Sequence, residues 1–126
     1  MTILYRSAPS ESPHFGRGSF WTMHPDSAEW LAEVEAGTPA LAAHRLYRRE
    51  VLIGDDVREQ PVDDLLQPLR EKPLQDALPR LRDALRNEGE RHAAAGCMWV
   101  QFTDHSKSWH GAMLYLGDDP IRAARA

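Results

Sequence analysis

The stretch that decides the fold is TILYRSAPSESPHFGRGSFWTMHPDSAEW, residues Thr2–Trp30. It begins with a short β-rich run that we expect to end at Arg6, because the turn-forming residues SAPSESP follow directly. A second extended run starts at Ser19 and stops before Pro25. Two strands that each end on a polar residue, joined by a loop with glycines at 16 and 18, can bring Arg6 and Thr22 to one edge of a sheet. This arrangement is typical of a binding site.

The rest of the chain alternates helical and extended patterns. Asp26 and Ser27 are N-cap candidates for a helix that ends at Gly37. Prolines limit the helical middle, so we expect two short helices and then a longer one that starts near Pro79 and ends at Gly96. Strands are expected at 44–53, where a helix over 40–50 is the alternative, and at 97–103 and 112–116, with a polar hairpin loop at 104–111.

Length and composition exclude several classes of protein. The 126 residues suit one domain, 1–126, and 42% hydrophobic with 27% charged residues excludes a disordered or fibrous chain. The net charge of -4 gives no electrostatic reason to expect nucleic acid or an anionic membrane as partner. A single cysteine, Cys97, excludes an internal disulfide framework, and we expect it to be buried and inert. No signal peptide or membrane span is expected, so a soluble, cytoplasmic protein is the default.

The order of these segments resembles the mono-ADP-ribosyltransferase fold, in the branch with an arginine on the first strand, a serine or threonine motif on the second and a late acid. The residues that carry the resemblance are Tyr5-Arg6-Ser7, Ser19-Phe20-Trp21-Thr22 and Gln101-Phe102-Thr103-Asp104. The short length and helical middle are also similar to small phage-encoded anti-CRISPR ADP-ribosyltransferases. The resemblance implies an α+β domain with a small bent or split, mostly antiparallel sheet and flanking helices.

The resemblance also implies a site for NAD. Arg6 would hold the phosphates and ribose, the Ser19–Thr22 motif would shape the nicotinamide pocket, and Asp104 would be the catalytic acid. The chain departs from the family's Glu-X-Glu or Gln-X-Glu motif, because Gln101 is followed three positions later by an aspartate. The implied catalytic residues are Asp104, Arg6 and Gln101, and the implied cofactor-binding residues are Arg6, Ser7, Gly18, Ser19, Phe20, Trp21 and Thr22.

These residue types suit the chemistry. Cleavage between nicotinamide and ribose develops positive charge that a fixed carboxylate stabilises, and an arginine fits pyrophosphate oxygens with its planar fork. Two literal Glu-X-Glu motifs, at 33–35 and 88–90, fall in helical segments, whereas the family's acid lies on a late strand. We therefore expect neither to be the catalytic motif.

Each of these residues also has a purely structural interpretation. Arg6 could be salt-bridged, and Asp104 could simply start a turn. We expect three tryptophans, at 21, 30 and 99, to be core anchors, and Trp109 to be exposed in the polar loop. The six histidines show no metal-ligand spacing, so no metal site is expected.

The expected function is therefore an NAD-dependent mono-ADP-ribosyltransferase that modifies a protein acceptor, as a toxin or as an effector in phage–host conflict, in its own or a target cell. Two alternatives stay open. One is a non-catalytic module that binds a protein partner through the 104–111 loop. The other is an NAD glycohydrolase toxin.

Overall fold

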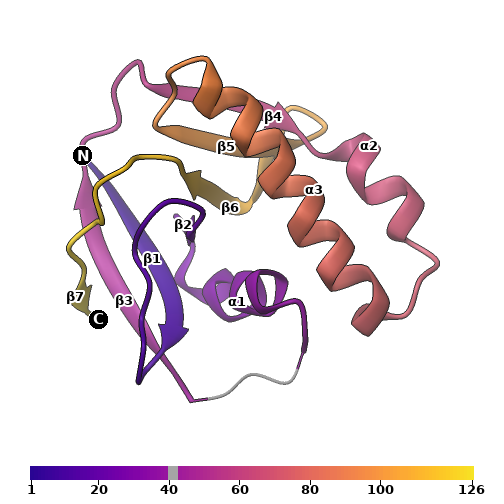
Figure 1. Ribbon diagram of the computed structural model, residues 1–126, viewed down its shortest axis with the longest axis horizontal. Coiled ribbons are helices and arrows are strands. Elements are labelled where there is room, and N and C mark those ends of the chain that lie inside the picture. The colour runs from indigo at the N-terminus through magenta and orange to yellow at the C-terminus, as the bar shows by residue number, and fades with distance from the viewer. Residues whose placement is uncertain (40–42) are drawn as a thin grey trace.

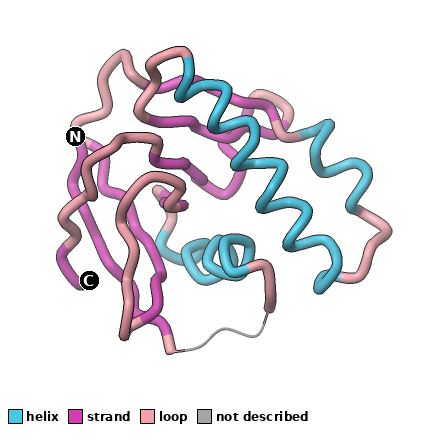
Figure 2. Tube along the Cα trace, viewed as in Figure 1, coloured by secondary structure: helices cyan, strands magenta, loops and turns pink. Residues whose placement is uncertain are grey.

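The chain folds into seven strands and three α-helices, in a computed structural model that describes residues 1–39 and 43–126 (Figures 1 and 2). The strands are β1 (Thr2–Pro9), β2 (Phe20–Thr22), β3 (His44–Val51), β4 (Val57–Pro61), β5 (Trp99–Asp104), β6 (Lys107–Tyr115) and β7 (Ala124–Arg125). The helices are α1 (Ala28–Ala36), α2 (Asp63–Leu66) and α3 (Leu74–Ala94), with short 3-10 turns η1 (Pro25–Ser27) and η2 (Gln67–Leu69). No helix in these ranges is long and apolar enough to cross a membrane.

All seven strands belong to one sheet, but its two halves are joined by a single residue pair. The strand order is β4-β5-β6-β2-β1-β3-β7. At the centre, β1 and β2 pair only at Tyr5 and Thr22, whereas β1 pairs with β3 along its whole length. β4 and β5 run parallel, and the other pairs run antiparallel. The expected α+β class is therefore confirmed, with a mixed sheet that divides at its centre.

Helices α1 and α3 cover one face of the sheet. α1 contacts β1, β2 and α3, and Figure 2 shows the two helices beside each other. α3 turns a leucine stripe inward through Leu78, Leu81 and Leu85, which repeat at helical spacing. The core between helices and sheet is completed by apolar residues of the strands, namely Phe20, Val100, Phe102, Trp109, Ala112 and Leu114.

A second, smaller core lies on the other side of the sheet. Its centre consists of Leu4, Trp21, Trp99, Met113 and Tyr115, all almost fully buried. Among the residues that the structure describes, no helix packs against this core. Loops, two strand residues and the C-terminal segment do, and the N–H of Ile121 donates to the carbonyl of Phe15 at 3.0 Å. The C-terminal segment closes this core and adds β7 to the edge of β3.

The first strand is longer than predicted. Ser7, Ala8 and Pro9 continue β1 and pair with Leu46, Arg45 and His44 of β3. A full-length partner strand outweighs their turn propensity, and Pro9 is tolerated because it is the last residue of the strand. Arg6 therefore lies in the middle of β1 and not at its end.

The strand predicted at 44–53 is confirmed as β3, which ends two residues earlier, at Val51. The helical alternative over 40–50 is wrong for the described residues, and 40–42 lie outside them. The predicted helix up to Gly37 is also confirmed, with Gly37 in the left-handed conformation at φ 74°. β4 was missed. It pairs in parallel with β5, and such long-range pairing leaves little local signal in VREQP.

The predicted start of the long helix near Pro79 is wrong. α3 begins at Leu74 and contains Pro79 as its sixth residue. The helix continues through the proline because burial of its leucine stripe offsets the lost backbone hydrogen bond.

The predicted 104–111 loop is also wrong. β5 and β6 form a tight hairpin whose turn is His105-Ser106, and Trp109 is 6% exposed in the core. Both turn residues have positive φ, 50° and 64°, as a type I′ turn requires. Because this turn lacks the usual Asn-Gly or Asp-Gly, the sequence pattern did not reveal it.

Candidate functional site

Arg6 is held inside the protein by an ion pair with Glu35 of α1. Its Nη1 and Nη2 donate to Glu35 Oε1 and Oε2 at 2.6 and 2.7 Å. Its Nε donates to the carbonyl of His14 at 2.6 Å, and Nη1 also donates to the carbonyl of Phe20 at 3.1 Å. With 2% of its surface exposed, Arg6 is closed to a dinucleotide in this conformation.

Glu35 has a third bond, from the backbone N–H of Phe20 at 2.9 Å. One carboxylate thus ties α1 to β1 and to β2. A buried ion pair is stable only when its remaining polar atoms are also hydrogen-bonded, as they are here. The structural interpretation of Arg6 matches this geometry. Glu35 belongs to one of the two Glu-X-Glu motifs that we did not expect to be catalytic.

The hydroxyl groups predicted to shape the nicotinamide pocket lie inside the fold. Ser19 Oγ accepts a hydrogen bond from Trp21 Nε1 at 2.9 Å. Thr22 Oγ1 donates to the carbonyl of His110 at 2.7 Å and accepts from the N–H of His24 at 3.0 Å. Ser19 and Thr22 are 0% exposed. Both side chains hold neighbouring segments in place.

The remaining residues predicted to bind the cofactor lie in different parts of the molecule and do not form one site. Phe20 and Trp21 are buried in the two separate cores. Gly18 has a φ of 88°, and its N–H donates to the carbonyl of Tyr115 at 2.8 Å. Ser7 is half-buried and lines a hollow of about 420 Å³ with residues of α1 and β3.

Asp104 does not join Arg6. It ends β5, and the strands β6 and β2 separate β5 from β1 in the sheet. Gln101 lies in the middle of β5, partly exposed and paired with Met113. Arg6 and Asp104 were expected to face each other across one NAD-binding cleft. In the structure they do not.

Asp104 instead contacts Asp63, the first residue of α2, at the β5–β6 turn. His105 spans the two carboxylates: its N–H donates to Asp63 Oδ1 at 3.0 Å, its Nδ1 lies 3.4 Å from that atom, and its Nε2 lies 3.6 Å from Asp104 Oδ1. The carboxylate side chains are 34% and 32% exposed, yet Asp104 Oδ1 is shielded from solvent without a hydrogen-bond donor. We call Asp63, Asp104, His105 and His110 the carboxylate–histidine cluster.

The two carboxyl groups have pKa values shifted in opposite directions. The pKa of Asp104 is raised by its side-chain hydrogen bond to Asp63, then by desolvation and by repulsion from the Asp63 charge. The pKa of Asp63 is lowered by that same hydrogen bond and by the N–H of His105. Of the two carboxyl groups, Asp104 is therefore the one that keeps its proton to higher pH, and it can donate that proton in a hydrogen bond to Asp63. Two carboxyl groups with opposite shifts are typical of acid–base sites.

His110 is included in the cluster because the charge of Asp104 acts on its pKa. Its ring lies 4.6 Å from the Trp30 ring and 5.2 Å from the Trp109 ring. Desolvation lowers its pKa, against the attraction of Asp104, and His24 lowers the pKa further. Its imidazole is therefore neutral at neutral pH and able to accept a proton.

Backbone strain concentrates in the same hairpin. In residues 1–39 and 43–126, the non-glycine residues with positive φ are His105, Ser106 and His110, at 50°, 64° and 54°. Such conformations cost free energy and cluster at functional sites. His110 adopts its positive φ where the β5–β6 pairing is irregular. The hydrogen bond from Thr22 Oγ1 to the carbonyl of His110 holds the backbone in this conformation.

The cluster also has the composition of a metal site. One ligand atom from each of Asp63, Asp104 and His105 lies within 4.8 Å of the others. Sequence reasoning missed this group because Asp63 lies 41 positions before Asp104 and spacing rules search locally. The doubled acid after Val62, at the start of a helix, was the available signal.

Comparisons with known proteins give no relative. No protein-family model, no curated protein and no solved structure matches this chain.

Proposed function

We propose that this protein is an NAD-dependent mono-ADP-ribosyltransferase with a protein acceptor, and that the carboxylate–histidine cluster performs its chemistry. The observation that carries the proposal is the contact between Asp63 and Asp104, with their pKa values shifted apart. The segment order and the divided sheet support the same fold expectation, although Arg6 has a structural role in this conformation.

Asp63 is the group suited to stabilise the ribosyl cation. It stays ionised because Asp104 and the N–H of His105 both donate to it. A carboxylate fixed before reaction stabilises the charge that develops on the ribose as its bond to nicotinamide breaks and the electron pair leaves on nicotinamide. Preorganisation by two donors makes Asp63 a better candidate for this role than Asp104.

His110 is suited to be the base. Its neutral imidazole can take the proton of the acceptor's oxygen or nitrogen as that atom bonds to ribose C1′. Asp104 thus acts through its neighbour Asp63, which it helps to hold ionised by donating a hydrogen bond to it.

Because Arg6 is buried, the NAD phosphates would bind exposed basic side chains beside the cluster, namely Arg70 and Lys107. Arg70 lowers the pKa of Asp104 by its charge, which places it near the carboxyl pair. Lys107 pairs with Asp104 across the hairpin turn. Both side chains belong to exposed residues and can reach an anionic substrate.

The test is nicotinamide release from NAD, followed by chromatography, and labelling of acceptor proteins with biotinylated NAD. Asp63→Asn and His110→Gln should each reduce both signals at least tenfold, while Glu90→Gln, which removes an exposed carboxylate elsewhere, should leave them unchanged. Free ADP-ribose without labelled protein would indicate the glycohydrolase. Absence of NAD turnover, together with no NAD binding by calorimetry, would overturn the proposal.

A non-catalytic binding protein is the second candidate. The observation that favours it is the internal use of Arg6, Ser19 and Thr22, because each makes hydrogen bonds that an NAD site would have to break. Calorimetry with NAD separates the transferase from the binding protein, since a protein that only binds a protein partner does not bind NAD.

A further inference from the structure

A pocket of about 430 Å³ lies at the opposite end of β5 from Asp104. It is formed where the end of β3, the start of β5 and the end of β6 meet the C-terminal segment. Its apolar lining includes Val51, Trp99, Tyr115 and Ile121. We call it the β3 pocket. Its volume falls in the range of small-molecule sites.

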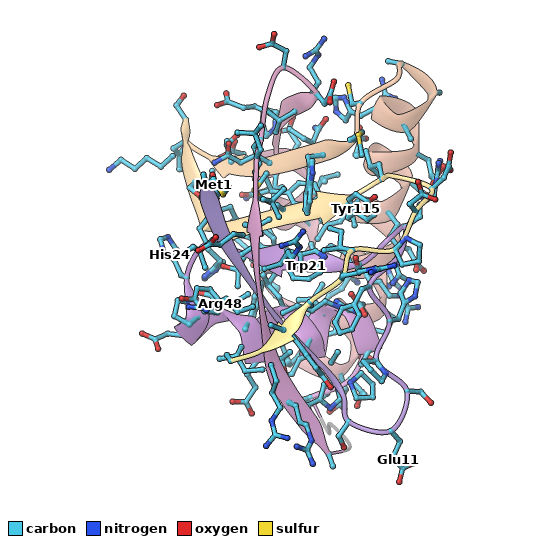
Figure 3. All side chains as sticks on the ribbon, turned by 90° about the vertical axis from the view of Figure 1, so that its left-hand side faces the viewer. Met1, Glu11, Trp21, His24, Arg48 and Tyr115 are labelled. Atoms are coloured by element: carbon cyan, nitrogen blue, oxygen red, sulfur yellow. The ribbon has the colours of Figure 1, made fainter. Side chains whose placement is uncertain are left out.

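Arginines gather at one end of the β3 pocket. Arg49 and Arg122 line it, and the same two residues line an adjoining hollow of about 250 Å³ together with Arg48. Figure 3 looks toward the side of β3 and β7, with Arg48 and Tyr115 labelled. The chain as a whole is acidic, at net charge -4, so this concentration of guanidinium groups is local.

The arginines at this end are available to an anion. Within the part of the chain that the structure describes, Arg48, Arg49 and Arg122 form no ion pair, whereas Arg6, Arg17, Arg82 and Arg91 each do. Arginines elsewhere, such as Arg58 and Arg125, also form none among the described residues, so the grouping of three is what distinguishes this place.

Two carboxylates moderate the charge. Glu50 lines both spaces, and Asp56 lines the β3 pocket but not the smaller hollow. The residues that line the adjoining hollow therefore include three arginines and one glutamate. This is the place where an anionic group is favoured.

The walls of the β3 pocket are fixed by bonds that involve no ligand. Tyr115 Oη donates to the carbonyl of Asp119 at 2.6 Å, which sets the turn before Pro120. The N–H of Ile121 donates to Phe15 and that of Ala126 to Leu46, both at 3.0 Å. The segment that carries Ile121 and Arg122 is thus held at both ends, so the pocket is preformed.

We infer that the β3 pocket binds a small organic phosphate, with the phosphate among Arg48, Arg49 and Arg122 and an apolar ring against Trp99 and Ile121. This site is independent of the proposed transferase chemistry, because it lies at the other end of β5 from the carboxylate–histidine cluster. Its test therefore needs no NAD and no acceptor.

The probe is phenyl phosphate, titrated into the full chain and followed by NMR through the indole N–H signal of Trp99, with inorganic phosphate as comparison. Phenyl phosphate should shift this signal and bind more tightly than inorganic phosphate. Arg122→Gln and Arg49→Gln should each weaken binding about tenfold, since a charge-assisted bond contributes on the order of 1.4 kcal/mol and each such step is a factor of ten. Arg125→Gln, an arginine on β7 outside both spaces, is the matched control.

A further variant tests the apolar end. Ile121→Ala should weaken phenyl phosphate but leave inorganic phosphate unchanged, and unchanged thermal unfolding shows that the variant is folded. No shift of the Trp99 signal at millimolar phenyl phosphate would overturn the inference. Equal losses in Arg125→Gln and Arg122→Gln, or equal affinity for the two probes, would overturn it as well.

Discussion

Arg6 and Glu35 form a two-pronged ion pair that joins the middle of β1 to the last turn of α1, at the place where the two halves of the sheet meet through one residue pair. The Arg6 side chain is 1% exposed and that of Glu35 18%. Because α1 also contacts β2 through Glu35, the ion pair stabilises a junction that the sheet alone holds weakly.

Glu35→Gln should therefore be strongly destabilising. Removal of the carboxylate charge leaves the Arg6 guanidinium buried without its counter-ion, and breaking a buried pair costs about 3–5 kcal/mol. Urea unfolding should show a loss of at least about 2 kcal/mol, the lower figure allowing for the partial exposure of Glu35. The double variant Arg6→Met, Glu35→Leu is the control. It should be more stable than Glu35→Gln, because it leaves no unpaired buried charge. A loss below about 0.5 kcal/mol in Glu35→Gln would show that the pair acts as a surface salt bridge.

The sequence pattern singled out Arg6 but placed it at the end of the first strand, and it did not reveal what Arg6 binds. Its partner is 29 positions away, and their contact depends on which face α1 turns toward β1. Patterns of apolar residues predicted the helix and its burial. They contain no information about which polar residue of a helix meets a distant arginine.

Thr22 gives a second prediction, because its hydroxyl is both donor and acceptor. Thr22→Val keeps the shape of the side chain but leaves the carbonyl of His110 and the N–H of His24 without their partner. Loss of a buried partner costs about 1–3 kcal/mol, measurable by urea unfolding. Thr22→Ser, which keeps the hydroxyl, should retain most of the stability. Equal stability of the valine and wild-type proteins would show that these bonds contribute nothing.

The carboxyl pair predicts a pH dependence of stability. The pKa of Asp104 is above its ordinary value of 3.8 in the folded chain, so the folded state binds more protons than the unfolded state between 3.8 and the raised pKa. This contribution is fully present below pH 3.8 and is lost as pH rises through the folded pKa. Asp63 contributes in the opposite sense, because its lowered pKa makes its contribution present above 3.8 and lost as pH falls through the folded value.

Asp104→Asn isolates the first effect. The difference in unfolding free energy between wild type and variant, measured by urea titrations from pH 3 to pH 7, should shift in favour of the variant as pH rises, because only the wild type loses the shared proton. The residues that face Asp104, namely Asp63, His105 and Arg70, are present in both proteins, and the amide of asparagine can still donate to Asp63. A difference that is constant with pH would contradict the shared proton.

The cluster itself was only half predictable. Asp104 stood out as the acid after a strongly strand-like run, whereas Asp63 looked like one of several charges on a solvated helix. Two facts of the tertiary structure bring them together: β4 pairs in parallel with β5, and α2 starts directly after β4. Since β4 has no clear pattern of its own, the position of Asp63 could not be inferred.

Gly89 gives the last prediction, and it separates helix propensity from packing. Gly89 lies inside α3 and is buried, with its Cα facing the Leu114 side chain of β6 so closely that an added Cβ would overlap Leu114 Cδ2. Alanine in place of glycine inside a helix gains about 1 kcal/mol of propensity. Overpacking a close helix–sheet contact costs about 1–3 kcal/mol.

Because α3 and β6 are both held by neighbouring elements, we expect the packing cost to exceed the propensity gain, so Gly89→Ala should lower the unfolding free energy by about 1 kcal/mol. The comparison is Gly54→Ala, where an added Cβ meets nothing within 4 Å, and this variant should be neutral. The double variant Gly89→Ala, Leu114→Val shortens the side chain at the contact by one carbon and should recover part of the loss. A stabilised Gly89→Ala would mean that the Leu114 side chain moves aside at little cost, and that helix propensity alone decides the sign.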